Sequence, residues 1–315
     1  MQVLDAAATR AALPFERLVP ALRELFAKGC TVPPRQVLDL GSFTSLVMPA
    51  WAEGRYYGVK VINIAPGNAS RGLPGLHASY LLFDGVTGVP VALLDGDEIT
   101  ARRTAAASAL AASCLAREDA RHLLVVGAGR IARLLPAAHA VVRPLERVSV
   151  WARDAAKAQA LAAQWREEGF DAHVATDLVL SCRAADIVSC ATLATEPVVQ
   201  GAWLAPGSHL DLIGSFTPAM READDACFAG AALYLDTEEA LKKSGELLGP
   251  MARGVFRAED VRGTLEQLAR GEVRGRRSKE ERTVFKSVGT ALEDLAAAML
   301  VVGENGRPGS PPSRG

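Results

Sequence analysis

Hydrophobic and polar positions in the first third of the chain predict a sheet that is followed by one long helix. Strand-like apolar runs lie at residues 36–40, 56–64, 79–83 and 89–94. The last two flank the segment 84–88, which reads Asp-Gly-Val-Thr-Gly and is typical of a hairpin or meander connection. An Ala-rich segment then predicts a helix that begins near the capping candidate Thr100 and ends near Ala116.

The middle of the chain changes to short apolar strands that alternate with helices. Strands are expected at residues 123–127, 148–151, 186–190, 209–213 and 231–235, with helices near 131–142 and 154–167. This alternation is the signature of an α/β fold with a parallel, doubly wound sheet. Beyond residue 238 the chain reads as helical and charged, and its final helix, 287–302, is apolar enough to pack on another element. Residues 303–315 are rich in Gly, Pro and Ser, which predicts a disordered tail.

Length and composition indicate an ordinary globular protein. The 315 residues are too many for one typical core, so one large or two medium domains are expected. Hydrophobic residues make up 49% and charged residues 23%, and the net charge is −1 with basic residues spread along the chain. We therefore expect neither nucleic acid nor an anionic membrane as a partner. Charge, Gly or Pro interrupts every apolar stretch before it reaches the length of a membrane span.

Cysteine usage and the N-terminal sequence favour the cytoplasm. The first ten residues have no basic start that is followed by an apolar run, so no signal peptide is expected. The five cysteines are scattered and include no Cys-x-x-Cys pair, which favours reduced thiols over disulfides or a zinc site. The five histidines show no ligand spacing either, and no metal is expected.

The most specific motif is a glycine turn of the form GxGxxA at residues 127–132. It follows an apolar strand and precedes a helix, as in a dinucleotide-binding unit. Gly127 permits the tight turn, and Gly129 lets the backbone approach a pyrophosphate. Arg130 and Ile131 follow at the start of the helix, whose N-terminus attracts phosphate charge. We expect these four residues to bind a dinucleotide cofactor.

The end of the second strand of this unit discriminates between the two nicotinamide cofactors. NAD sites usually carry an acid there, about 20 residues after the glycines, to hold the ribose hydroxyls. The strand tip here carries no acid, and Arg153 stands where a 2′-phosphate would lie. The pattern favours NADPH, with NADH as the alternative. In the competing interpretation Asp154 caps the next helix and Arg153 is only solvated.

A lysine and an arginine lie among apolar positions in the first part of the chain. Period-two alternation places Lys60 on one face with Ile62 and Ile64, and Val59 and Val61 on the other. A strand that is apolar on both faces is expected to be buried, and a buried lysine requires an anionic partner. An edge strand whose lysine reaches solvent is the alternative.

Arg103 occupies a similar position on the predicted Ala-rich helix. It shares a helical stripe with Ala107, Leu110 and Cys114, near the start of the helix. There its guanidinium could hold a substrate carboxylate as a bidentate fork. A surface arginine with its charge in solvent fits the pattern equally well. Arg35, after two prolines, shows no partner in the pattern.

A series of short, distinctive sequence blocks lies along most of the chain, from about residue 33 to residue 295. They are Pro34-Arg35, Met48-Pro49-Ala50, Gly58-Val59-Lys60, Arg71-Gly72-Leu73-Pro74, Leu94-Asp95-Gly96, Thr100 with Arg103-Thr104-Ala105-Ala106, the glycine turn, Phe285-Lys286-Ser287-Val288-Gly289 and Glu293-Asp294-Leu295. Together they resemble the ornithine cyclodeaminase/mu-crystallin family. So many blocks in one order make the resemblance specific.

The resemblance implies a two-domain enzyme that forms a homodimer. Residues 1–118 and 284–302 would form an α+β domain for substrate binding and dimerisation. A Rossmann domain of residues 119–283 would be inserted between these two segments.

The resemblance also assigns roles to individual residues. Arg35, Lys60 and Arg103 would hold the substrate carboxylate beside the nicotinamide. Thr192, Gly214 and Ser287 would bind the cofactor. For Lys60 and Arg103 the implied role agrees with their position among apolar neighbours. For Arg35 the resemblance implies the substrate carboxylate as a partner.

One position departs from part of the family. Ornithine cyclodeaminases and archaeal alanine dehydrogenases carry an Asp after the glycines that follow the fifth strand, where it handles the substrate amine. In this chain residues 213–222 read Ile-Gly-Ser-Phe-Thr-Pro-Ala-Met-Arg-Glu, and Phe216 stands at the Asp position. Without that carboxylate, oxidative deamination lacks its base. The stretch is similar to that of family members that reduce delta-1-pyrroline-2-carboxylate and delta-1-piperideine-2-carboxylate, and the mu-crystallin branch lacks the Asp as well.

The resemblance therefore implies that the substrate is a small cyclic imino acid. NADPH would deliver hydride to the imine carbon next to the carboxylate, which yields L-proline or L-pipecolate. Phe216 would bind the ring as an apolar wall. A bound iminium, Lys60 or water could supply the proton, and the residues do not decide between five- and six-membered rings.

Two other functions stay open. The protein could be an ornithine cyclodeaminase or alanine dehydrogenase in which another group replaces the missing Asp. It could also be a mu-crystallin-like protein that binds NADPH without turnover. The three retained cations favour an enzyme, because a pure binder does not need to place a carboxylate next to a hydride donor.

Overall fold

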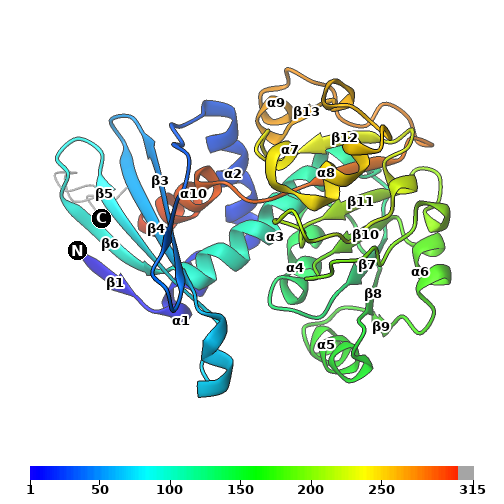
Figure 1. Cartoon of the computed structure of the whole chain (residues 1–315), viewed down its shortest axis with the longest axis horizontal. Helices are drawn as coiled ribbons and strands as arrows, with labels where there is room; N and C mark the ends of the chain where they lie inside the picture. The colour runs from blue at the N-terminus through cyan, green and yellow to red at the C-terminus, as the bar shows by residue number, and fades with distance from the viewer. Residues whose placement is uncertain (304–315) are drawn as a thin grey trace, which may run out of the picture. The chain divides into compact units, whose positions relative to one another are not determined.

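The computed structural model describes residues 1–303, which form two compact units (Figure 1). The first unit contains residues Met1–Arg103 and the segment that begins at Thr290, and the second unit contains Thr104–Gly289. The sequence placed the boundaries at 118/119 and 283/284, and the assignment of substrate and cofactor domains stays a prediction. The disordered tail predicted for 303–315 lies, apart from Gly303, outside the described residues.

The first unit is built on a six-stranded sheet with the order β1-β6-β5-β4-β3-β2. The strands are β1 (Gln2–Leu4), β2 (Gln36–Asp39), β3 (Thr44–Ala52), β4 (Tyr56–Ile64), β5 (Leu76–Asp84) and β6 (Pro90–Asp95). Neighbouring strands are antiparallel except β1 and β6, which run parallel. The four predicted strands are present, and β1 and β3 are additional.

Two helices cover one face of this sheet. They are α2 (Phe15–Lys28) and α10 (Ala291–Val302), and α10 packs on β3, β4 and β6 while α2 packs on α10 (Figure 1). Leu18, Leu22 and Leu25 form the buried stripe of α2 at helical spacing. The unit also contains α1 (Ala6–Ala12), the 3-10 helix η1 (Pro66–Arg71) and the first turns of α3 (Gly96–Leu115).

The expected start of the long helix at Thr100 is wrong by one turn. Helix α3 begins at Gly96, and the Asp95 carboxylate accepts the Glu98 N–H at 2.8 Å. Thr100 lies inside the helix, where its hydroxyl donates to the Gly96 carbonyl at 2.7 Å. Asp95 therefore takes the capping role.

The expectation that β4 is buried on both faces is also wrong. Tyr56, Gly58, Lys60 and Ile62 are buried on the face under the helices, but Val61 on the opposite face is 36% exposed. An antiparallel sheet commonly packs one face on a core and leaves the other uncovered. The apolar character of the uncovered face therefore needs a separate explanation.

The second unit contains an eight-stranded, all-parallel sheet with the order β13-β12-β14-β11-β10-β7-β8-β9. The strands are β7 (His122–Val126), β8 (Arg147–Trp151), β9 (Ala172–Val174), β10 (Ile187–Cys190), β11 (His209–Leu212), β12 (Ala232–Leu235), β13 (Gly263–Thr264) and β14 (Thr283–Lys286). The chain order reverses between β7 and β10, which is the switch point where ligands bind in doubly wound sheets. The predicted Rossmann-type fold is confirmed.

Helices and 3-10 segments connect these strands. They are η2 (Ala132–Leu134), α4 (Leu135–Ala140), α5 (Ala155–Glu167), α6 (Leu178–Ala184), η3 (Gly201–Trp203), η4 (Asp225–Cys227), α7 (Ala240–Lys243), α8 (Gly245–Ala252), η5 (Ala258–Asp260) and α9 (Leu265–Arg270). The segment predicted as one helix near 131–142 is a 3-10 turn followed by a short α-helix. The final helix begins at Ala291 rather than 287, because Thr290 caps it. None of the helices in residues 1–303 is long and apolar enough to cross a membrane.

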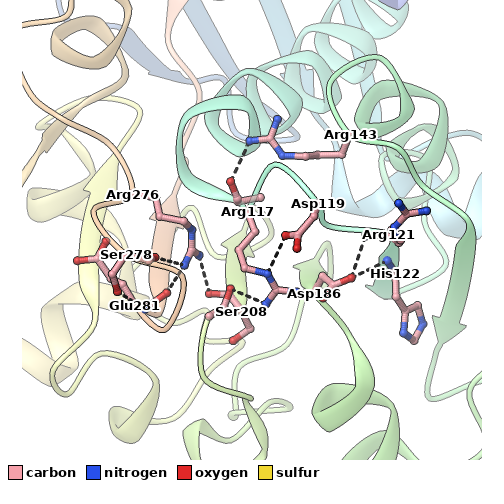
Figure 2. A network of polar contacts seen from close by, with 12 residues as sticks. Arg117, Asp119, Arg121, His122, Arg143, Asp186, Ser208, Arg276, Ser278 and Glu281 are labelled. Atoms are coloured by element: carbon pink, nitrogen blue, oxygen red, sulfur yellow. Dashed lines mark hydrogen bonds and ion pairs between the residues drawn. The ribbon is translucent and has the colours of Figure 1, made fainter.

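Two arginines of the polar network in Figure 2, Arg143 and Arg276, donate hydrogen bonds to backbone carbonyls at the C-terminal end of α3 in the second unit. Arg143 donates through Nη2 to the carbonyls of Ala112 and Ala116 at 2.7 and 2.9 Å. Arg276 donates through Nε to the Leu115 carbonyl at 2.7 Å. The last carbonyls of a helix lack the full set of partners within the helix, and these cations supply further donors at this end of α3.

Candidate active site

Lys60 lies in the centre of the first unit's sheet and is fully buried. Strand β4 runs between β3 and β5, which rules out the edge-strand alternative. The Nζ atom of Lys60 lies 2.5 Å from Oδ2 of Asp294, which α10 places over the sheet. Burial lowers the pKa of Lys60 to about 8, although the Asp294 carboxylate opposes this shift. The lysine is thus poised to exchange a proton near neutral pH.

Arg103 reaches the same carboxylate from α3. Its Nε donates to Asp294 Oδ1 at 2.9 Å, and its Nη1 donates to Glu293 Oε2 at 2.5 Å. Burial by itself would lower the pKa of Arg103, but Asp294 and Glu293 outweigh that effect and raise it. The alternative of a solvated surface arginine is therefore wrong. We call Lys60, Arg103, Glu293 and Asp294 the charged cluster.

Neighbouring residues of the sheet surround Lys60 closely. Lys60 lies directly opposite Met48 on β3 and Tyr80 on β5. A Cβ atom on Gly58 would lie 2.0 Å from the Tyr80 hydroxyl oxygen, so only glycine fits at this position. The buried Tyr80 ring thus packs over Gly58, beside the lysine.

The pairing leaves part of the guanidinium's capacity unused. A guanidinium carries five N–H donors, and the bonds to Asp294 and Glu293 use two of them. With two cations and two carboxylates, the formal charges of the cluster balance.

Arg35 lies in the same unit, directly before β2. It is half-buried and precedes the edge strand β2, with β3 between that strand and β4. Gln36 pairs with Val47 on β3, and the next residue of β3, Met48, pairs with Lys60, so Arg35 precedes β2 in the row of the sheet that contains Lys60. Its role in holding the substrate stays a prediction.

The glycine turn has the shape that a dinucleotide site requires. Gly127 follows β7 with φ at 121°, a value that favours glycine. A Cβ atom there would lie 2.5 Å from the Ala191 carbonyl oxygen and 3.4 Å from Thr192 Cγ2. A Cβ atom on Gly129 would meet no described atom within 4 Å, so this side of the turn is open to a ligand. Arg130 is exposed and Ile131 half-buried at the start of η2.

At the end of β8, Arg153 is exposed and Asp154 is used for another purpose. The Asp154 carboxylate caps α5 and accepts the N–H groups of Ala156 and Lys157 at 3.0 and 3.3 Å. This confirms the capping interpretation for Asp154. The acid is thus engaged by the backbone, whereas the guanidinium of Arg153 lies in solvent at the tip of the strand.

Thr192, Gly214 and Ser287 follow the carboxyl ends of β10, β11 and β14. The Ser287 N–H donates to the Leu212 carbonyl at 3.1 Å, so its loop continues the ladder of the sheet. Phe216 lies two residues beyond Gly214 and is 45% exposed. Adjacent parallel strands therefore place these predicted residues at one edge of the sheet.

The sequence did not predict a role for three buried carboxylates, two in the charged cluster and one beside the loops that follow β10 and β11. Glu293 and Asp294 belonged to a recognised sequence block, but no role was given to them. Glu222 is fully buried and binds the loops that carry Thr192 and Gly214. Burial raises the pKa of Glu222 to about 8, and Lys286 opposes that shift. The signal that could have identified Glu293 and Asp294 is their place next to an apolar helix stripe, which continues at Leu295.

The described residues include no group of three or more His, Cys, Asp or Glu side chains that could hold a metal ion. None of the five cysteines, all of which lie within residues 1–303, forms a disulfide.

Comparison with known proteins gives concordant matches over nearly the whole chain. A reductase from Paracoccus denitrificans, named delta(1)-pyrroline-2-carboxylate reductase, is 46% identical over 286 residues, which is 88% of this chain and 90% of that protein. The structure of the Thermococcus litoralis delta(1)-pyrroline-2-carboxylate reductase, in complex with NADH and L-proline, matches with a TM-score of 0.90 at 32% identity, covering 96% of each chain. An archaeal alanine dehydrogenase dimer with bound NAD matches with a TM-score of 0.89 at 29% identity, covering 96% of this chain and 94% of that one.

The model of the ornithine cyclodeaminase/mu-crystallin family matches residues 19–307, which is most of the chain. This range contains the charged cluster of the first unit and the glycine turn of the second. The chain belongs to the ornithine cyclodeaminase/mu-crystallin family.

Proposed function

We propose that this protein uses NADPH to reduce a cyclic ketimine acid, delta-1-pyrroline-2-carboxylate or delta-1-piperideine-2-carboxylate, to L-proline or L-pipecolate. The observation that carries the proposal is the charged cluster, in which Arg103 is buried yet keeps unused donors. It occurs in a chain that also has an open dinucleotide turn, and it agrees with the names of the similar reductases.

The charged cluster is suited to bind the substrate carboxylate. Hydrogen bonds between a guanidinium and a carboxylate are short, strong and directional. Asp294 fixes the orientation of Arg103 and Lys60, so both cations are held in place before the substrate arrives. Arg35 is proposed as a third cation for the same carboxylate.

The glycine turn and its neighbouring loops are suited to bind the cofactor. Gly127, Gly129, Arg130 and Ile131 would contact the pyrophosphate, and Thr192, Gly214 and Ser287 would line the nicotinamide side. Arg153 at the tip of β8 supports NADPH over NADH, because Asp154 is committed to capping α5.

The nicotinamide, when bound, supplies the hydride for the imine carbon next to the carboxylate. The imine must be protonated to accept the hydride. The pKa of Lys60 is about 8, so its Nζ carries a proton at pH values below 8. Asp294 keeps that ammonium paired at 2.5 Å, which limits the cost of holding it in a buried site. Lys60 is therefore the proposed proton donor.

Phe216 separates this function from deamination. An oxidative deaminase needs a base to take a proton from the substrate amine. Phe216 has no titratable group and would instead form an apolar wall against the ring. This favours imine reduction over the ornithine cyclodeaminase or alanine dehydrogenase reaction.

A homodimer would explain the uncovered face of the first unit's sheet. Tyr57 stacks on Phe83 with ring centroids 5.4 Å apart and meets Trp51 edge-on at 6.5 Å. Val59 and Val61 lie on the same face. An extended apolar and aromatic surface is typical of a subunit interface.

The proposed location is the cytoplasm, because the five cysteines form no disulfide.

The test is the loss of NADPH absorbance with each of the two ketimine acids, run beside NADH and beside NAD with L-ornithine. We expect NADPH consumption and formation of the L-amino acid, detected by chiral chromatography. Release of ammonia from ornithine with no imine reduction would overturn the proposal. Tight NADPH binding without turnover of any imine would support a mu-crystallin-like binding protein instead.

A further inference from the structure

Glu222 joins two loops that follow neighbouring strands of the second unit's sheet. Its Oε1 accepts the backbone N–H of Thr192 at 2.7 Å and the hydroxyl of the same residue at 2.8 Å. Its Oε2 accepts the N–H of Gly214 at 2.7 Å. One carboxylate thus joins Thr192, in the loop after β10, to Gly214 in the loop after β11.

The two loops meet so closely that no side chain fits between them. A Cβ atom on Gly214 would lie 1.8 Å from the Thr192 carbonyl oxygen and 2.6 Å from Glu222 Oε1. Thr192 also lies beside the glycine turn, because a Cβ atom added at Gly127 would be 3.4 Å from Thr192 Cγ2. A continuous line of contacts therefore runs from Glu222 through Thr192 to the glycine turn.

A second buried carboxylate holds Glu222 itself. Glu246 on α8 accepts the Glu222 N–H through Oε2 at 2.7 Å and the Ala223 N–H through Oε1 at 2.9 Å. Its Oε2 also accepts the Ser215 hydroxyl at 2.7 Å. The buried ammonium of Lys286 is attracted by both carboxylates and donates to the Leu212 carbonyl at 3.0 Å. The position of Glu222 is thus set from two directions.

We propose that Glu222 is a positioning residue for the cofactor, which acts by holding Thr192 and Gly214 in place at the switch point of the sheet. The inference rests on the proposed role of these two residues in cofactor binding. Loss of the Glu222 carboxylate should therefore weaken cofactor binding beyond any effect on folding.

The test compares Glu222→Gln with Asp211→Asn, a matched change at another fully buried carboxylate, which lies on β11. Asp211 accepts the hydroxyls of Ser189 and Ser108 at 2.5 and 3.2 Å and contacts neither loop residue. NADPH affinity is measured by titration of its fluorescence, together with the melting temperature of each variant. We expect Glu222→Gln to raise the Kd for NADPH by roughly tenfold or more, because an amide NH2 replaces one of the two oxygens that accept hydrogen bonds from Thr192 and Gly214. Asp211→Asn should lower the melting temperature and leave the Kd within about twofold.

A double-mutant comparison covers the case in which Glu222→Gln does not fold. Thr192→Val removes only the hydroxyl donor, and Glu222→Asp keeps the charge on a shorter side chain. Each alone should raise the Kd, and in combination the effects should not add, because both remove the same contact. Unchanged Kd values in these variants would overturn the inference. The readout needs no turnover, so a protein that binds NADPH but reduces no imine would refute the proposed function and still test Glu222.

Discussion

The four residues of the charged cluster depend on one another. Lys60 and Arg103 are buried cations, and Asp294 contacts both of them. A buried ion pair contributes little net stability, but removal of one partner leaves an uncompensated charge in the core. The cluster is therefore costly to disturb, which suits a site that must keep a fixed geometry.

Asp294→Asn tests this dependence. We expect the free energy of unfolding to fall by about 3–5 kcal/mol, because both cations lose a charged partner. Urea denaturation measures the change. Lys28→Gln, at the exposed pair of Lys28 with Glu24, is the control and should alter stability by no more than about 1 kcal/mol. Equal effects of the two substitutions would show that the cluster is not buried as described.

The pKa of Lys60 predicts a pH limit for imine reduction. Burial lowers this pKa to about 8, so the proton on Nζ is present below that pH and is lost above it. We expect kcat/KM to decline as the pH rises through about 8. Lys60→Arg keeps the charge at all accessible pH values but is too weak an acid to donate the proton, so kcat/KM should fall and the decline near pH 8 should disappear. Since titration of the free substrate is common to both proteins, identical profiles would argue against a role for Lys60.

The sequence identified the cations of the site but not their partners. Lys60 and Arg103 stood out because each interrupts an apolar pattern. Asp294 and Glu222 did not, because acids near helix starts and in loops are common and mostly exposed. Only the three-dimensional packing shows that these carboxylates are buried.

At the scale of elements, strands with strong apolar runs were predicted more reliably than helix ends. The runs at β7, β10 and β11 gave the parallel sheet directly. Strand β14 was missed because Thr283–Lys286 is short, contains a lysine and pairs with β11 and β12, which lie far away in the sequence. The helix after the glycine turn was predicted too long, since its first turn is a 3-10 turn that the apolar spacing does not reveal.

Helix α4 carries a buried histidine that predicts acid sensitivity. His139 is fully buried, its Nδ1 lies 2.9 Å from the Leu135 carbonyl oxygen, and burial lowers its pKa to about 4. The unfolded chain takes up this proton near pH 6.5, whereas the native state resists it down to about pH 4. Stability is therefore complete above pH 6.5 and is lost as the pH falls toward 4.

Unfolding measurements at pH 7 and pH 4.5 check this expectation. His139 by itself should lower the free energy of unfolding by about 2–3 kcal/mol between these values. His139→Gln should show a smaller loss, and His209, whose pKa burial also lowers, retains part of it. His173→Gln, at a largely exposed histidine, is the control. The same pH dependence in all three proteins would contradict the assignment.

At the scale of the whole molecule, the two sheets differ in what their faces require. The alternation of strands and helices predicts the parallel sheet of the second unit, whose strands are buried. The first unit's sheet is antiparallel and has helices on one face only, so its uncovered face could not be inferred from a pattern that is apolar on both sides. The resemblance to a known family, rather than periodicity, predicted a two-domain enzyme.

A charge on the uncovered face should separate the proposed homodimer. Tyr57→Glu places a carboxylate between Trp51 and Phe83, where an interface would have to desolvate it. We expect a dimeric wild-type protein and a monomeric variant in light scattering coupled to size-exclusion chromatography. Val86→Glu, at an exposed apolar residue of the β5–β6 connection, should leave the dimer intact. A wild-type protein that is monomeric would overturn this part of the proposal.

The most direct measurement of the central claim compares two imines that differ only in the carboxylate. NADPH consumption is followed with delta-1-pyrroline-2-carboxylate and with delta-1-pyrroline, in the wild-type protein and in Arg103→Lys. If the charged cluster binds the carboxylate for hydride transfer, kcat/KM should favour the acid by about 100-fold or more, and the variant should lose much of that preference. Equal rates with both imines, or no reduction of either, would contradict the account.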